Sequence, residues 1–210
     1  MIVSPKRLRS HSERGAVVVE MAFISIILVM LIAGTFNYGF AWRAGLAVNE
    51  AARTGARVGS GQSVSRGADY YALNGIRSSL QSAGLLGNVK KVVIFKANTA
   101  DGKVPSTCLL ASPTGLCNVL KDTQLANLTL SSFNLTISSD PAVAPSGSGC
   151  LKSTAALRSG WCPDARTNIQ DTGSDYYGVY VEVFVENHFK MLGQGQTVTR
   201  TAVMQLEPAV

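Results

Sequence analysis

The feature that most constrains this chain is an apolar run close to its N-terminus. Residues 16–42 carry a single charge, at Glu20, and residues 21–40 carry none. A helix that crosses a bilayer needs about 20 predominantly apolar residues. A cleaved secretory signal is the alternative, but its apolar core covers only about 7–15 residues. The sequence therefore predicts a transmembrane helix over 16–42.

Positive charge is concentrated in the residues before this run. Residues 1–15 contain Lys6, Arg7, Arg9 and Arg14 against Glu13, a net charge of +3 out of +6 for the whole chain. Basic residues beside a span hold that end in the cytoplasm. We therefore expect a cytoplasmic leader over 1–15, a span through the cytoplasmic membrane, and an external C-terminal domain. The later Lys and Arg residues are scattered, which argues against a nucleic-acid partner.

A helical pattern continues beyond the span. Small residues recur there at three- and four-residue steps and form a narrow stripe, made of Ala44, Ala47, Ala51, Gly55 and Val58. We expect residues 43–59 to extend the same helix, so that 16–58 measures about 65 Å at 1.5 Å per residue. The stripe permits close approach by a neighbouring helix or by the protein's own sheet.

The external domain, residues 60–210, carries both helical and strand patterns. After a break at 59–65, a second helix is predicted over 67–83, and Gly84 ends it. Residues 89–97 are rich in β-branched side chains and predict a strand. Residues 125–138 fit either a helical turn or a short strand. Two stretches rich in Ser, Gly, Pro and Cys are predicted to be irregular, 101–117 and 140–175.

The strongest strand pattern lies near the C-terminus. Four valines alternate with larger or charged residues, which places Val179, Val181, Val183 and Val185 on one face and Tyr180, Glu182, Phe184 and Glu186 on the other. Residues 177–189 and 197–206, joined by a glycine-bearing loop at 190–196, predict an antiparallel hairpin, to which strand 89–97 could add. The predicted fold class is α+β, with a long N-terminal helix, a second helix and a small antiparallel sheet.

All four cysteines, Cys108, Cys117, Cys150 and Cys162, lie in the predicted external domain. An even number in an oxidising compartment indicates two disulfides, for which three pairings are possible. We favour Cys108–Cys117 with Cys150–Cys162, because each pair would close one local loop. A zinc site is the alternative, but the short paired-ligand spacing is absent and no His lies nearby.

Glu20 is the residue with an unusual physical requirement. A carboxylate at the bilayer centre costs about 2.5–3.5 kcal/mol. That cost disappears if Glu20 lies near the cytoplasmic interface and reaches water. It also disappears if the chain is cleaved between Gly15 and Ala16, as in a pilin-type precursor. The new α-ammonium then lies one helical turn from Glu20, and it could pair with this carboxylate or with that of a neighbour. We expect processing, with Glu20 acting in assembly.

The residue combinations typical of enzymes are absent from the sequence. His11 and His188 have no Ser, Cys or carboxylate arrangement suited to a catalytic triad. The sequence contains no phosphate-binding loop, paired-histidine metal helix or dinucleotide fingerprint. We expect no catalytic residues, no metal site and no cofactor.

Two segments resemble a known family. Residues 14–32, RGAVVVEMAFISIILVMLI, and the segment AARTGAR at 51–57 are similar to TadE-like proteins of the tight-adherence (Flp) pilus machinery. Those proteins carry a basic leader, a glycine before an apolar stretch with Glu, and an A-A-R-x-G-A-R segment, here Ala51, Ala52, Arg53, Gly55, Ala56 and Arg57. Residues 175–208 are similar to longer actinobacterial members.

The resemblance implies a pilin-like minor pilin or pseudopilin that assembles, primes or tips a type IV-related (type IVc) pilus. It implies cleavage between Gly15 and Ala16 by a prepilin peptidase, and partners among other pilins and assembly-platform proteins. The expected location is the cytoplasmic membrane, and the cell surface when the protein is part of a pilus. One alternative is a static single-pass accessory protein of the secretion complex. Another is an anchored extracellular enzyme or binding domain.

Overall fold

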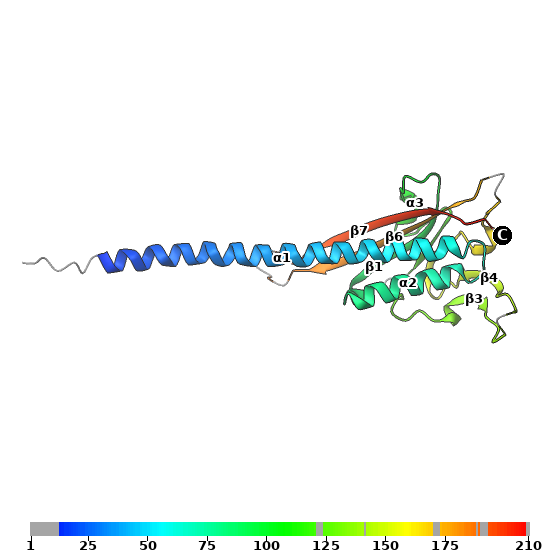
Figure 1. The fold of residues 1–210 in the computed structure, drawn as a ribbon, viewed down its shortest axis with the longest axis horizontal. Coiled ribbons are helices and arrows are strands. Elements are labelled where there is room, and N and C mark those ends of the chain that lie inside the picture. The colour runs from blue at the N-terminus through cyan, green and yellow to red at the C-terminus, as the bar shows by residue number, and fades with distance from the viewer. Residues whose placement is uncertain are drawn as a thin grey trace, which may run out of the picture.

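A computed structural model of the chain shows one long helix that stands free at one end and packs into a folded unit at the other (Figure 1). The structure describes residues 13–120, 124–140, 142–169, 173–187, 189 and 193–208. Most of the basic leader, with His11, and also His188, lie outside the described residues. We call residues 15–43 the shaft, and the rest of the helix together with all later elements the head.

Helix α1 (Glu13–Gly61) is continuous over 49 residues, as the sequence predicts. Its sequence contains no proline, and the serine and threonine hydroxyls within the shaft are satisfied by the helix itself. Ser25 donates to the carbonyl of Ala22 and Thr35 to that of Leu31, each at 2.8 Å. Such internal bonds keep these two donors paired when the surroundings are apolar.

Helix α2 (Ala68–Ser82) follows a turn and packs beside α1. Gly84 ends it in the left-handed conformation, with φ of +71°. The N–H of Gly84 donates to the Gln81 carbonyl at 3.0 Å, and that of Leu85 to the Leu80 carbonyl at 2.9 Å. This pair of bonds is the Schellman motif, so the predicted end of the second helix is confirmed.

The main sheet has five strands in the order β5-β2-β1-β6-β7, with every neighbouring pair antiparallel. Strand β1 (Val89–Ala97) pairs with β6 (Tyr176–Glu186), and β6 pairs with β7 (Gly195–Gln205). The predicted hairpin and its third strand are therefore confirmed. The predicted bounds were wrong at each end: β6 covers Tyr176–Glu186 rather than 177–189, and β7 covers Gly195–Gln205 rather than 197–206.

The stretches predicted to be irregular contain regular structure, which corrects that expectation. They hold α3 (Ser106–Leu109), the first residue of β2 (Cys117–Leu120), β4 (Ser146–Leu151), β5 (Ala156–Ser159) and the 3-10 helix η3 (Pro163–Ala165). The ambiguous stretch contains both a 3-10 turn, η2 (Leu130–Ser132), and a strand, β3 (Phe133–Thr136), which pairs with β4. A further 3-10 turn, η1 (Leu86–Asn88), precedes β1. These elements are three to six residues long, too short to show a period in sequence.

Hydrophobic residues cover both faces of the sheet. On one face, the valines of β6 predicted to share a side pack against α1 and α2, and Val179, Val181 and Val183 are fully buried. On the other face, Phe95 and Tyr180 form a smaller core with the disulfide between Cys108 and Cys117. The sheet is thus a central layer, which fixes the C-terminal part of α1 on a rigid support.

Candidate functional site

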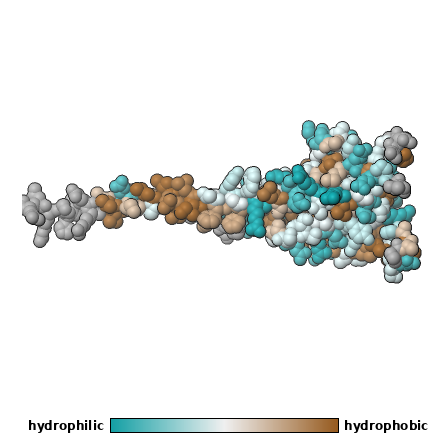
Figure 2. All heavy atoms as spheres, in the orientation of Figure 1, coloured by the Kyte–Doolittle hydropathy of each residue, from teal (hydrophilic) through white to brown (hydrophobic). Residues whose placement is uncertain are grey.

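The shaft presents large apolar side chains to its surroundings. Phe23 is 66% exposed and Leu31 is 64% exposed, and none of the most apolar 18-residue stretch is buried. Figure 2 shows this apolar surface along the helix giving way to pale and hydrophilic residues where the head begins. Exposed apolar area costs about 25 cal/mol per Å² in water, so a surface of this size must be shielded from water by a membrane or by other protein. The shaft is consistent with the single span of a membrane protein.

The residues predicted for processing and assembly lie at the start of this helix. Gly15 and Ala16 are in the first turns of α1 and exposed, and Glu20 is exposed one turn further along. Glu20 is the single charged residue between 15 and 42. A free amino group at Ala16 would lie four residues from the Glu20 carboxylate, a spacing at which side chains on a helix are neighbours.

The segment AARTGAR has two faces. Ala51, Ala52 and Ala56 are fully buried in the head, while Arg53 and Arg57 are exposed. A side chain at Gly55 would overlap Ile76 of α2, so the glycine permits the two helices to pack closely. The small-residue stripe therefore packs within the protein's own head, which decides between the two contacts that the sequence left open.

A buried polar cluster ties α2 to the sheet and to the segment that contains η3 and Arg166. Asp69 forms an ion pair with Arg166 at 2.6 Å, and both side chains are fully buried. Tyr177 donates to the same carboxylate at 2.9 Å, and the Asn118 amide donates to its second oxygen at 2.8 Å. The Arg166 guanidinium also lies 4.4 Å from the Trp161 ring centre.

This cluster is structural in its geometry. Burial, followed by the charge of Asp69, raises the pKa of Tyr177 well above its usual value, so the phenol stays protonated and donates. A side chain at Gly59 would overlap the Tyr177 ring, which brings α1 into direct contact with the cluster. Sequence reasoning missed it, because Asp69 and Arg166 are 97 residues apart and neither belongs to a motif.

The cysteines are paired as Cys108–Cys117 and Cys150–Cys162. The first disulfide joins α3 to the start of β2, and the second joins β4 to the residue before η3. Each closes a loop of about ten residues, which is worth about 2–4 kcal/mol. Among the described residues, no group of three His, Cys, Asp or Glu side chains is placed to hold a metal ion.

One side of α1 remains uncovered even within the head. Leu46, Glu50, Arg53 and Arg57 are all exposed and follow one another at three- and four-residue steps. The face combines an apolar side chain, an acid and two bases. A helix face of this kind can accept another helix, with opposite charges opposed.

A comparison with family models places the N-terminal part of the chain. The model of the TadE-like protein family matches residues 15–57, which comprise the shaft and most of the helix in the head. The predicted resemblance is confirmed over this segment, which indicates a protein associated with a Tad pilus and, through it, with a membrane and other pilus components. No match is found among curated proteins or among solved structures.

Proposed function

We propose that this chain is a minor pilin or pseudopilin of a tight-adherence (Flp, type IVc) pilus system, which assembles, primes or tips the pilus. The observation that carries the proposal is the exposed apolar shaft, which joins a disulfide-linked head without a break in α1. The shaft spans the cytoplasmic membrane before assembly, with its N-terminus in the cytoplasm, and packs among other apolar helices afterwards. The head lies outside, where disulfides persist.

Processing prepares the shaft for assembly. A prepilin peptidase cleaves between Gly15 and Ala16, both exposed at the start of α1. The carboxylate of Glu20 then pairs with the α-ammonium of Ala16 on a neighbouring subunit. This pairing compensates two opposite charges within an apolar environment. The carboxylate is also stabilised by the helix dipole, which is positive at the N-terminus of α1.

The uncovered face of α1 supports side-by-side packing in the head. Glu50 lies three residues from Arg53, a rise of about 4.5 Å, so a small axial offset between copies brings the acid of one beside the base of the next. These contacts are partly exposed to solvent and contribute about 0–1 kcal/mol each. The shaft therefore supplies most of the assembly energy, and the charged face fixes the register.

The test compares two carboxylates on the same helix. Glu20→Gln should still insert and fold, but its recovery in sheared surface filaments should fall at least tenfold. Glu50→Gln, which removes only one contact of the charged face, should lower this recovery by less than threefold. Intact mass of native protein should show the loss of residues 1–15. Retention of the leader, or recovery only in membranes, would favour the static accessory protein. If Glu20→Gln forms filaments normally, the proposed role of this carboxylate in assembly is wrong.

A further inference from the structure

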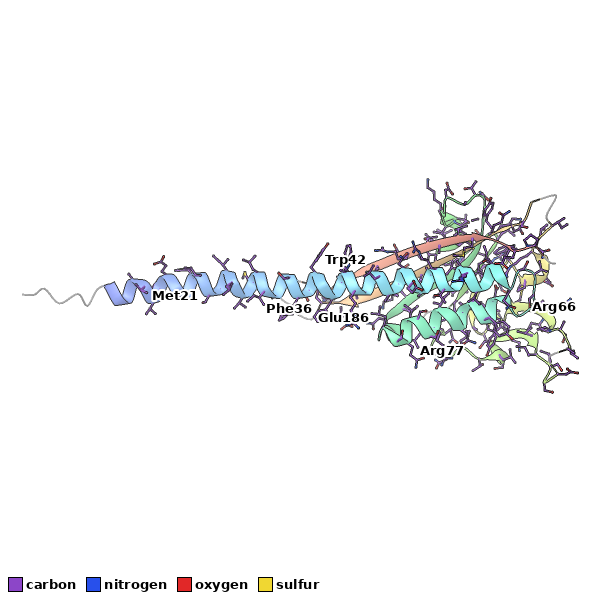
Figure 3. The ribbon with its side chains drawn as sticks, in the orientation of Figure 1. Met21, Phe36, Trp42, Arg66, Arg77 and Glu186 are labelled. Atoms are coloured by element: carbon purple, nitrogen blue, oxygen red, sulfur yellow. A yellow bond between two sulfur atoms is a disulfide. The ribbon has the colours of Figure 1, made fainter. Side chains whose placement is uncertain are left out.

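A groove runs between α1 and the first half of β7, where the shaft enters the head. It has a volume of about 530 Å³, within the range of small-ligand sites. Its lining comes from two strips of the chain: Tyr38, Ala41, Trp42, Gly45, Leu46 and Asn49 from α1, and Gln196, Thr197, Val198, Thr199 and Arg200 from β7. Figure 3 shows Trp42 at this junction. We call it the Arg200 groove.

The groove changes character along its length. Its end toward the shaft is apolar and aromatic: Tyr38 is 69% exposed and Trp42 is 61% exposed, and their ring centres lie 6.4 Å apart. Its end toward the head carries the amide of Asn49 and one cation, Arg200, while Thr197 and Thr199, whose side chains alternate to the other face of β7, line it with backbone. Among the residues that the structure describes, no carboxylate lines the groove, and its one charge is positive.

The guanidinium of Arg200 is held at the groove by its neighbours. One terminal nitrogen, Nη1, donates to the Thr199 carbonyl at 2.7 Å. The other, Nη2, lies 3.3 Å from the position that a Cβ atom would occupy on Gly45, so the absence of a side chain there leaves room for it. Neither of the ion pairs found among the described residues involves Arg200. Its charge is therefore free to meet an anion.

The position of the groove along α1 sets its depth in a bilayer. If residues 21–40 fill the hydrocarbon layer, about 30 Å at 1.5 Å per residue, Gly45 lies about 7 Å beyond that layer. This is the level of the lipid headgroups, which form a zone about 5–8 Å thick on each side. Tyr38 and Trp42 then lie at the boundary, where aromatic residues are enriched. The head consequently stands on the membrane without a spacer.

We propose that the Arg200 groove binds an anionic phospholipid of the membrane that holds the shaft, with phosphatidylglycerol as the probe. The acyl end lies along Tyr38 and Trp42, and the phosphate accepts hydrogen bonds from the guanidinium of Arg200 and from the amide of Asn49. Arg is suited to this task because its planar fork binds phosphate in a bidentate manner. The inference rests on the membrane anchoring of the proposed function.

The test uses the full chain reconstituted in vesicles of phosphatidylcholine with a minor fraction of phosphatidylglycerol. Spin-labelled forms of the two lipids report the motionally restricted fraction at the protein. The unchanged chain should restrict phosphatidylglycerol at least threefold more than phosphatidylcholine. Arg200→Gln should reduce the ratio to about one, and Arg200→Lys should retain part of it. Arg57→Gln, which removes an exposed arginine about 18 Å further along α1, is the matched control and should leave the ratio unchanged.

Depth is measured separately with nitroxides on single added cysteines, since all four native cysteines are in disulfides. A label at Gln196 should lie at headgroup depth, while a control label at Gln62, near the end of α1, should be fully aqueous. Two results would overturn the lipid site but leave the anchoring intact: an unchanged ratio in Arg200→Gln, or equal depths at the two labels. A chain that does not float with the vesicles would overturn both. The lipid restriction could also be present at low protein density and disappear at high protein density. This result would identify a neighbouring subunit as the occupant of the groove.

Discussion

The shaft and the head-bound part of α1 belong to one helix but have opposite surfaces. In the shaft, large apolar residues surround the helix on every side and are exposed. In the head, small residues such as Ala52 and Ala56 form the buried side, and charged residues form the other. Both parts are helical, so the difference between their surfaces follows from their surroundings. An apolar solvent accepts large side chains all round, whereas a folded head accepts only small ones on one face.

The glycines show the same contrast. A side chain added at Gly34 in the shaft would meet nothing within 4 Å. Side chains added at Gly55 and Gly59 would overlap Ile76 and Tyr177. Glycine in the head therefore sets the distance between elements, while glycine in the shaft has no packing partner among the described residues.

The largest effects are expected when a charge is placed in the shaft or in the head-bound part of α1. Val48→Asp puts an unpaired carboxylate at a fully buried position, and the head should fail to fold, because such a group has no partner. Leu28→Asp should leave the head folded but impair insertion, since an acid at the helix centre costs about 2.5–3.5 kcal/mol. Protease resistance of the head and flotation with vesicles separate the two outcomes. A head that tolerates Val48→Asp would contradict the assignment of this side of α1 to the core.

Removing Asp69 tests the buried cluster that α1 contacts through Gly59. Asp69→Ala leaves Arg166 buried without its partner and should lower the free energy of unfolding by about 3–5 kcal/mol. Lys96→Ala breaks the ion pair with Asp175, in which Lys96 is 37% exposed, and should cost about 0–1 kcal/mol. Denaturant titration in detergent, followed by the fluorescence of Trp161, measures both. Equal costs would mean that the cluster adds nothing through its burial.

Paired glycine substitutions sharpen the comparison directly. Gly59→Val should destabilise the head by about 1–3 kcal/mol, since the added methyl groups must displace the Tyr177 ring. Gly34→Val should leave the unfolding transition of the head unchanged. The same denaturant titration applies. A matched loss with Gly34→Val would show that the shaft and head are not independent in stability.

The smallest effect is a dependence on alkaline pH. Because the pKa of Tyr177 is raised in the folded head, the unfolded chain loses this proton first. The stabilisation is fully present below about pH 10, the usual tyrosine pKa, and is lost as pH rises toward the folded pKa. Tyr177→Phe should therefore flatten the decline of the unfolding midpoint above pH 10, measured against the unchanged chain. If the unfolding midpoint declines equally in Tyr177→Phe and in the unchanged chain, Tyr177 is not the cause of the decline.

Much of the fold follows from patterns within single segments. The apolar run, the Gly84 helix end, strand β1 and the β6–β7 hairpin all follow from local periodicity or turn residues, and the structure contains each of them. Strands β4 and β5 do not, because segments such as 146–151, SGSGCL, have no alternation of their own. They form through pairing with β3 and β2, respectively, which no pattern within either segment indicates. The second core behind the sheet had one available signal, the uninterrupted apolar run 92–95 in β1, which is typical of a strand buried on both faces.

The candidate site divides in the same way. Gly15, Glu20 and the AARTGAR segment all lie on one continuous helix, so the helical period alone places them. Arg200 meets Gly45 only through the packing of β7 on α1. Asp69 and Arg166 likewise come together only when α2 and the loop after β5 close on the sheet.

The sequence by itself determined that the chain has a long apolar helix, because hydrophobicity, a missing proline and small-residue spacing act within one segment. It also determined the hairpin, whose strands lie close together along the chain, and it favoured the two disulfide loops over the other possible pairings. Only the tertiary structure decided which side of α1 is covered, where the buried ion pair forms and how the Arg200 groove is built. Those features depend on contacts between residues distant in the chain, whose free energy is gained only after the elements have packed.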